Sequence, residues 1–359
     1  MGPTLSRYFG LRCLKSMLAV FAGMLALIML LDYVEMMRKA SDIPQISALL
    51  VLQTSVFRVP QVAERLMPFC VLIGTMWAFL NLSRRLELVV ARSAGISAWQ
   101  FITPAVTAAF VLGVLATTIY NPISASLQEQ AKRLETQMFR GSAAENRGGF
   151  WGRQRTDEGL AIINAKASRD QGVELTSVTI FTFDLQGRFR ERIEAKAASL
   201  QSGRWELENA KIYTVDGAPS EKATLSVPTD LTPEQIRESF ANPETVSFWE
   251  LPQYIDMAAR SDLAGAGYRL QFHKLLAKPM LLASMVLLAA AVSLRFFRFG
   301  GVQSMVLSGV IAGFLLYVLS KVTDDMSKAD LLSPIGAAWL QVAFGSLIGG
   351  VALLYQEDG

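Results

Sequence analysis

Long uncharged runs lie on both sides of one charged stretch in this chain, and this division constrains its fold more than any other feature. Residues 121–268 contain 17 Lys and Arg and 21 Asp and Glu, whereas the remaining 211 residues contain only 17 and 10. The uncharged runs cover residues 16–31, 66–83, 93–128, 279–294, 299–320 and 331–356. A helix needs about 20 mostly apolar residues to cross a bilayer. The sequence therefore predicts three membrane spans before a polar domain and three after it.

Two features near the N-terminus need interpretation. The first run has the length of a signal-peptide core, but no small-x-small cleavage site precedes Asp32, so an uncleaved first span is favoured. Residues 43–57 form a further uncharged run of 15 residues that contains Pro44. This run is too short for a span, so we expect a helix that lies at the membrane interface and leads into the second span.

Composition excludes several classes of protein. Charged residues make up 18% of the chain, whereas about 25% is usual in a soluble globular protein. Two Cys and one His are too few for a Cys/His zinc centre or a disulfide framework. The net charge of +3 gives no argument for nucleic-acid binding. No G-x-x-x-x-G-K-[ST] motif occurs, so we expect this chain to have no P-loop for ATP. No G-x-S-x-G motif and no metal-ligand cluster occurs either, so we expect no catalytic residue, no metal and no cofactor of its own.

The short loops between the spans predict the orientation of the chain in the membrane. Short cytoplasmic loops carry an excess of Lys and Arg. The N-terminal tail and the loops after the second and fourth spans carry eight such residues, whereas the short loops on the opposite side carry four. We therefore expect both termini in the cytoplasm and the polar domain outside it.

The polar domain has the sequence pattern of β-strands. Residues 174–184, 188–200 and 204–215 are rich in strand-forming side chains, and turns at Gln186-Gly187 and Ser202-Gly203 separate them. Strands near ten residues long with such turns predict either a hairpin meander or a two-sheet roll. Because no catalytic motif accompanies them, we interpret the domain as a protein-docking or ligand-passing module.

The loop after the second span, RRLELVVARSAGISAW, predicts a short amphipathic helix. Gly95 is suited to end that helix, and Ser97 is suited to cap the third span. Two interpretations remain open: the loop is a plain interfacial connector, or it is a coupling helix that docks into a cytoplasmic ATPase, with Glu87 as its ionic anchor. In the second case the contributing residues are Arg85, Glu87, Leu88, Arg92 and Gly95.

Basic residues at the outer ends of the spans are candidates for binding an anionic lipid headgroup. Arg269, His273, Lys274 and Lys278 enter the fourth span, and their spacing puts most of them on one helical stripe. Such a stripe suits either phosphate binding or simple anchoring at the interface. Arg38, Lys39, Arg58 and Arg65 precede or follow the first two spans and are further candidates. Gly309 and Gly313 form a GxxxG pattern that allows close helix packing, or contact between subunits, in the fifth span.

Three of these features together resemble a known family. They are the R-x-E-L-V-V-x-x-x-x-G-x-S pattern that starts at Arg85, the FWELPQYI stretch at residues 248–255, and the arrangement of three spans, a domain and three spans. The chain resembles the YjgP/YjgQ permeases, which are the LptF and LptG subunits of lipopolysaccharide exporters, and it is more similar to LptG than to LptF. The resemblance covers essentially the whole chain.

The resemblance implies a fold and an organisation. It implies a polytopic α-helical membrane protein with six transmembrane helices and an extracytoplasmic β-jellyroll-like domain. The expected parts are 1–128 for the first three transmembrane helices with a coupling helix at about 84–98, 129–266 for the periplasmic domain, and 267–359 for the last three helices. In such proteins the first and fifth spans line lateral gates, which would include Gly309 and Gly313.

The resemblance also implies a function. The chain is expected to be an inner-membrane permease subunit that extracts lipopolysaccharide and passes it to a periplasmic bridge. Its expected partners are an LptF-like second permease, an LptB-like ATPase dimer that binds the ATP and Mg²⁺, an LptC-like single-span protein and an LptA-like bridge. The alternatives are a structural anchor of an envelope complex and, less favoured because no reactive cluster is present, a lipid-modifying enzyme.

Overall fold

The computed structural model describes most of the chain. The described residues are 2–41, 46–138, 150–156, 159–169, 172–184, 186–201, 203–214, 217–229, 232, 242–260, 265–299 and 301–357. They divide into two compact units. A helical unit comprises Met1–Glu135, Pro243–Pro252 and Ala266–Gly359, and a sheet unit comprises Thr136–Asn242 and Gln253–Gly265. Each unit is described by itself below.

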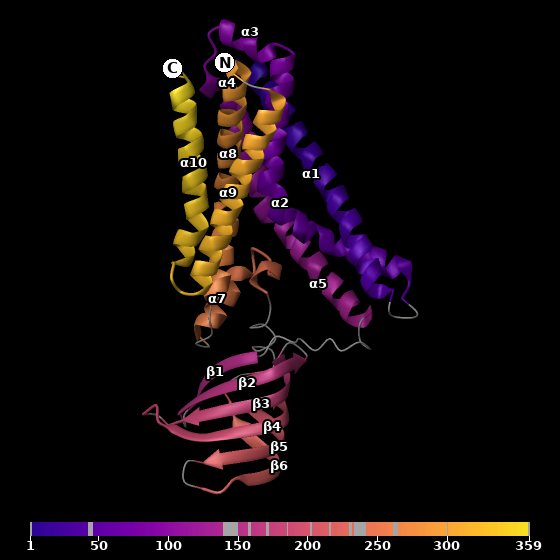
Figure 1. The fold of residues 1–359 in the computed structure, drawn as a ribbon, viewed down its shortest axis with the longest axis vertical. Coiled ribbons are helices and arrows are strands. Elements are labelled where there is room, and N and C mark those ends of the chain that lie inside the picture. The colour runs from indigo at the N-terminus through magenta and orange to yellow at the C-terminus, as the bar shows by residue number, and fades with distance from the viewer. Residues whose placement is uncertain are drawn as a thin grey trace. The chain divides into compact units, whose positions relative to one another are not determined.

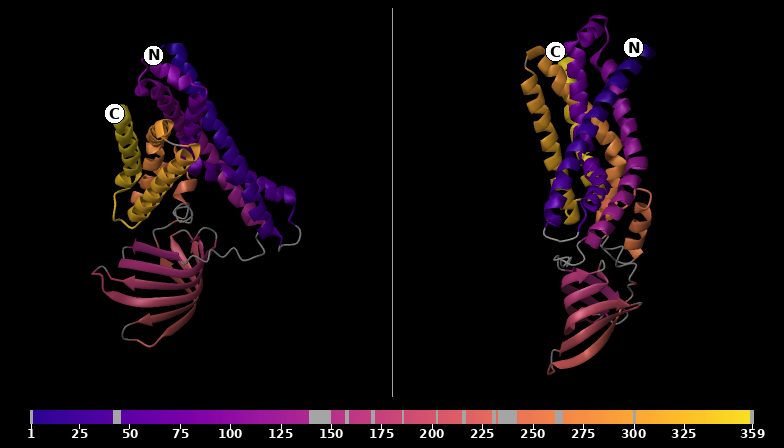
Figure 2. Two further views of the ribbon diagram at one scale, coloured as in Figure 1. Left: turned by 45° about the horizontal axis from the view of Figure 1, so that its top comes forward. Right: turned by 90° about the vertical axis from the view of Figure 1, so that its right-hand side faces the viewer.

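Within the described part of the chain, six helices of the helical unit are long and apolar enough to cross a membrane. In chain order the helical elements are α1 (Pro3–Ala40), α2 (Ala48–Arg84), α3 (Glu87–Ser93), α4 (Ala98–Leu115), a π-helical turn (Ala116–Tyr120), α5 (Asn121–Met138), α7 (Leu251–Arg260), α8 (Ala266–Phe299), α9 (Val302–Lys328) and α10 (Pro334–Glu357). The third membrane-length helix is α4 continued through the π-helical turn into α5. The prediction of six spans is confirmed. Both termini and α3 lie at the same end of this unit (Figures 1 and 2).

The predicted helix over residues 43–57 that leads into the second span is present from residue 48, and it runs into that span without interruption. Residues 48–57 are the first ten residues of α2, which continues to Arg84 with Pro60 and Pro68 inside it. A proline inside a helix removes one backbone hydrogen bond and usually bends or breaks the helix. Here Val51, Thr54 and Val59, which lie in the turns before Pro60, are almost completely buried. Tertiary packing on this face therefore keeps the helix continuous.

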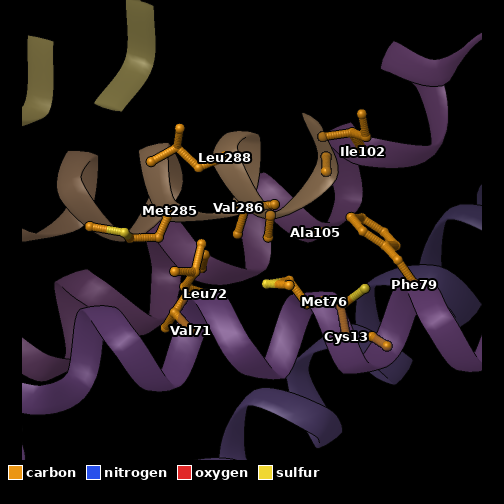
Figure 3. Packing of buried hydrophobic residues seen from close by; sticks show 14 of the residues in the cluster. Cys13, Val71, Leu72, Met76, Phe79, Ile102, Ala105, Met285, Val286 and Leu288 are labelled. Atoms are coloured by element: carbon orange, nitrogen blue, oxygen red, sulfur yellow. The ribbon is translucent and has the colours of Figure 1, made fainter. Parts of the chain in front are cut away.

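Small residues allow the helices of this unit to approach each other closely. A Cβ atom on Gly74 of α2 would lie 2.6 Å from the Cα of Met17 in α1, and one on Gly113 of α4 would lie 2.4 Å from the Cα of Pro279 in α8. Around these contacts Cys13, Phe79, Ile102 and Val286 belong to one buried apolar cluster that joins α1, α2, α4 and α8 (Figure 3). This core sets the positions of the helices that form the site described below.

The sheet unit contains one six-stranded antiparallel sheet in which every strand pairs with its neighbours in sequence. The strands are β1 (Phe150–Thr156), β2 (Gly159–Arg169), β3 (Glu174–Phe183), β4 (Phe189–Gln201), β5 (Arg204–Thr214) and β6 (Ser220–Pro228). Of the two predicted alternatives, a hairpin meander and a two-sheet roll, this strand order is the meander. The sheet is curved (Figure 1). The predicted strands correspond to β3, β4 and β5 within one residue at each end. Strands β1, β2 and β6 were missed, since β6 is largely exposed and polar and β2 is rich in alanine.

The predicted turn at Gln186-Gly187 joins β3 to β4. Gly187 has a φ of 79°, a conformation that glycine adopts without strain. The Asp184 carboxylate accepts hydrogen bonds from the backbone N–H groups of Arg188 at 2.8 Å and Gln186 at 3.0 Å, and the Arg188 side chain also donates to it. These bonds, chiefly that from the Arg188 backbone, lower the pKa of Asp184. Their contribution to stability is therefore present above the unfolded-state pKa and is lost as the pH falls through the folded-state pKa. The predicted turn at Ser202-Gly203 includes Ser202, which lies outside the described residues.

Candidate substrate cavity and coupling helix

A cavity of about 250 Å³ lies within the helical unit between α2, α8 and α9. Its apolar lining includes Phe69 of α2, Met285 of α8 and Tyr317 of α9. Its polar lining includes side chains of both charges from the same helices. Glu244, on the 3₁₀ turn Pro243–Thr245, also contributes. The cavity therefore combines an apolar wall with a charged rim, a combination that suits one end of an amphipathic ligand.

Three basic residues that line the cavity are each paired with a carboxylate of the same chain. Lys274 Nζ lies 2.7 Å from Asp324 Oδ2, which joins α8 to α9. Lys278 of α8 pairs with Glu64 of α2, and Arg65 of α2 pairs with Glu244. The partners are far apart in sequence, so only the tertiary structure brings them together.

The Glu64 carboxylate is the centre of a buried polar network. Glu64 is 7% exposed and also accepts hydrogen bonds from Asn121 Nδ2 at 3.1 Å and Ser124 Oγ at 2.7 Å, besides its ion pair with Lys278. A buried charge is tolerated only when it is paired and hydrogen-bonded, and this network meets both conditions. The network thus holds α2, α5 and α8 together at one side of the cavity.

The segment that returns from the sheet unit is attached to the same network. The backbone N–H of Phe248 donates to Asn121 Oδ1 at 2.9 Å, and the Phe248 ring stacks on Phe272 of α8 with centroids 5.5 Å apart. Trp249 Nε1 donates to the Thr118 carbonyl in the π-helical turn at 3.1 Å. The first two residues of the FWELPQYI stretch, which the sequence singled out only as a motif, therefore dock on the helices beside the cavity.

The π-helical turn contributes two further contacts to this region. Thr117 Oγ1 donates to the Leu275 carbonyl of α8 at 2.9 Å, and Tyr120 Oη donates to the Pro60 carbonyl of α2 at 2.9 Å. Single π-helical turns within α-helices occur frequently at functional sites. Here Thr118, in the turn, accepts the hydrogen bond from the Trp249 side chain, and Asn121, directly after the turn, accepts the one from the Phe248 backbone.

The structure brings together only part of the predicted headgroup set. Arg65, Lys274 and Lys278 line the cavity, whereas the other five residues do not. Lys39 pairs with Glu35 at 2.6 Å on α1, and Arg58 lies 3.6 Å from Asp32 and 3.9 Å from Glu135. Arg38 and Arg269 are exposed, and the His273 ring contacts Phe272 edge-on. The stripe on α8 is therefore divided, with Lys274 and Lys278 facing the cavity.

Several residues of this site were missed by sequence reasoning. They are the carboxylates and the amide that compensate the cations: Glu64, Asn121, Glu244 and Asp324. A signal was present for Glu64, which is the single acidic residue between Asp42 and Arg84 on a long apolar helix. An acidic residue at such a position is a functional candidate by default.

The predicted short helix after the second span is present as α3. Leu88 and Ala91 are buried, whereas Leu86, Val89 and Val90 are 61%, 56% and 64% exposed. Apolar exposure of this extent on a short helix marks a candidate docking face.

Both predicted capping residues around this loop are confirmed. Gly95 has a φ of 81°, its N–H donates to the Arg92 carbonyl at 3.0 Å, and the N–H of Ile96 donates to the Ala91 carbonyl at 3.2 Å. These two bonds form a Schellman motif at the end of α3. Ser97 Oγ accepts a hydrogen bond from Gln100 N at 3.3 Å and caps α4.

The predicted coupling residue Glu87 has partners within its own chain. Arg12 Nη1 lies 3.0 Å from Glu87 Oε1, and Tyr8 Oη donates to Glu87 Oε2 at 3.0 Å. Arg85, which lies before α3, and Arg92, in its last turn, are both exposed. Glu87 therefore joins α3 to the first turns of α1.

The glycines of the fifth span pack against α2 of the same chain. A Cβ on Gly309 would lie 2.4 Å from Met76 Sδ, and one on Gly313 would lie 3.1 Å from both Leu72 and Phe69. Gly313 also lines the cavity. The observed contacts give this pattern a packing role within the chain.

Six membrane-length helices, a sheet unit inserted between the third and the fourth, and a cavity with a charged rim define a polytopic membrane permease. The family model described as lipopolysaccharide export system permease LptF/LptG matches residues 7–356, and the chain belongs to this family. The chain is 25% identical to the LptG permease protein of Haemophilus influenzae over 340 residues, 90% of each chain. It is 23% identical to the LptG permease protein of Escherichia coli strain K12 over 360 residues, 96% of each chain.

Proposed function

We propose that this chain is an LptG-type subunit that extracts lipopolysaccharide from the inner membrane and passes it to an LptA-like periplasmic bridge. The observation that supports this most is the cavity between α2, α8 and α9. Its apolar wall suits acyl chains, and Arg65, Lys274 and Lys278 suit phosphate groups. The family assignment and the two LptG relatives give the same substrate class.

The energy for transport comes, in this proposal, from a partner. The sequence contains no P-loop, so ATP and Mg²⁺ bind to an LptB-like ATPase dimer. The exposed face of Leu86, Val89 and Val90 on α3 is the proposed contact with that ATPase. An LptF-like second permease and an LptC-like single-span protein complete the assembly.

The function is tested by crosslinking from inside the cavity. A photoreactive phenylalanine analogue in place of Tyr317, which lines the cavity, should form an adduct with lipopolysaccharide in native membranes. The same analogue in place of Tyr355, which is 86% exposed on α10, is the matched control and should form at least tenfold less adduct. Equal adduct yields at the two positions, or none at Tyr317, would contradict a substrate cavity.

The proposed topology puts both termini in the cytoplasm and the sheet unit in the periplasm. The Lys and Arg counts of the short loops support it, and so does the position of both termini and α3 at one end of the helical unit (Figure 1). A cysteine at Gln186 should react with a membrane-impermeant maleimide in cells whose outer membrane alone is permeable, and one at Arg298 should not. Background labelling is expected to be low because Cys13 and Cys70 are both buried. The reverse labelling pattern would overturn this orientation.

A further inference from the structure

The charges around the cavity nearly cancel, although the cavity belongs to a family that exports a polyanionic lipid. Among the described residues, four cations and three carboxylates line it: Arg65, Lys274, Lys278 and Lys321, with Glu64, Glu244 and Asp324. We propose that Glu244 determines lipid specificity by competing with lipid phosphate for Arg65. A lipid headgroup with several phosphate charges displaces Glu244, whereas a glycerophospholipid with one phosphodiester does not. This inference rests on the proposed function, because it assumes that the cavity receives the lipid headgroup.

The three ion pairs differ in how readily a ligand could replace the carboxylate. The side chain of Glu64 is 8% exposed and that of Asp324 is 13% exposed, whereas that of Glu244 is 37% exposed. A displaced carboxylate must find water or another donor, because an unpaired buried charge is costly. Glu244 is the one of the three that water can reach without rearrangement of the helices. Its partner Arg65 is 57% exposed, so a ligand can also reach the guanidinium.

Two backbone contacts hold the segment around Glu244 in place. Gln61 Nε2 donates to the Glu244 carbonyl at 2.7 Å, and four residues further on the Phe248 backbone is bound to Asn121. The backbone of this segment therefore stays in place when the side chain moves. Because the Glu244 carboxylate is tethered beside Arg65 by its own chain, it competes with a free lipid phosphate for Arg65 at a high effective concentration.

The competition discriminates by charge. A single phosphodiester that displaces Glu244 exchanges one anionic partner of Arg65 for another and gains little. A headgroup with further phosphate charge also contacts Lys321, a second cation of the cavity lining, whose own pair with Asp325 is long at 3.7 Å and more than half exposed, and therefore offers little competition. Specificity of this kind arises from a built-in repulsive element as well as from attraction. Glu244 supplies that element by excluding the more weakly charged lipid.

The test compares two lipids bound to the purified native complex. Wild-type complex and the variants Glu244→Gln and Glu250→Gln are incubated in mixed micelles of lipopolysaccharide and phosphatidylglycerol, and the retained lipids are quantified by mass spectrometry. In Glu244→Gln the ratio of phosphatidylglycerol to lipopolysaccharide should rise about tenfold, equivalent to about 1.4 kcal/mol. Glu250 is exposed on the same segment and does not line the cavity, so Glu250→Gln should leave the ratio unchanged.

A second variant shows whether the effect acts through Arg65. In the double variant Arg65→Gln/Glu244→Gln the gain in phosphatidylglycerol should disappear, because the cation that attracts it is gone. A wild-type lipid ratio in Glu244→Gln, or a gain that persists without Arg65, would overturn the specificity role while lipopolysaccharide binding still supports the proposed function. If wild-type complex retains no lipopolysaccharide, the proposed function itself fails.

Discussion

Replacing Lys278 with glutamine is expected to destabilise the helical unit by roughly 3–5 kcal/mol, because it leaves the Glu64 carboxylate buried without its cation. The side chains of Lys278 and Glu64 are only 12% and 8% exposed, so solvent cannot compensate the loss. Asn121 and Ser124 continue to donate to the carboxylate, but neither of them carries a charge. The quantity to measure is the free energy of unfolding in mixed micelles.

A neutral pair at the same positions should recover most of that loss. In the double variant Glu64→Gln/Lys278→Gln no buried charge remains, and replacing both partners of a buried ion pair is often close to neutral. Lys39→Gln is the matched control, since the Lys39–Glu35 pair is about half exposed and should contribute less than about 1 kcal/mol. If Lys278→Gln and the double variant are equally stable, the buried pair does not hold these helices together.

The second large effect is expected at α3, where Glu87→Lys should abolish transport. In wild type the carboxylate lies 3.0 Å from Arg12, so lysine there places two cations against each other. If Glu87 also pairs with an arginine of the ATPase, its loss costs roughly 3–5 kcal/mol of binding, at least about a hundredfold in affinity. Copurification of the ATPase and lipopolysaccharide release in proteoliposomes are the two measurements. The same reversal at Glu206, an exposed residue of β5, should change neither.

Exchanging the charges of Arg12 and Glu87 distinguishes the role of the pair within the chain from the role of a pair between Glu87 and the ATPase. The double variant Arg12→Glu/Glu87→Arg restores an ion pair between α1 and α3, so the stability of the helical unit should return close to that of wild type. ATPase binding should remain lost, because the partner subunit then meets an arginine instead of a carboxylate. Full recovery of transport in the exchange variant would show that Glu87 acts only through Arg12. Normal transport in Glu87→Lys would show that α3 is a plain connector.

The features predicted well are those that depend on neighbouring residues in the sequence. The apolar runs predicted six spans, and the strand-forming residues between X-Gly turns predicted β3, β4 and β5 within one residue at each end. Gly95 and Ser97 end α3 and begin α4 through bonds to residues at most five positions away. The helix that leads into the second span was predicted, but its uninterrupted continuation into that span was not, because run length alone does not report the burial of Val51 and Val59.

The sequence alone determined the class of this protein: a six-span membrane chain with an inserted β-domain, marked by motifs of the LptF/LptG family. Only the tertiary structure decided the character of the site. Lys278 meets Glu64, which is 214 positions away, and Arg65 meets Glu244, which is 179 positions away. A list of basic residues therefore predicted a strongly cationic site, whereas the folded chain has a nearly neutral one. Local patterns report which residues are apolar or charged, but the effective charge of a cavity depends on which distant carboxylates the packing of the helices brings to it.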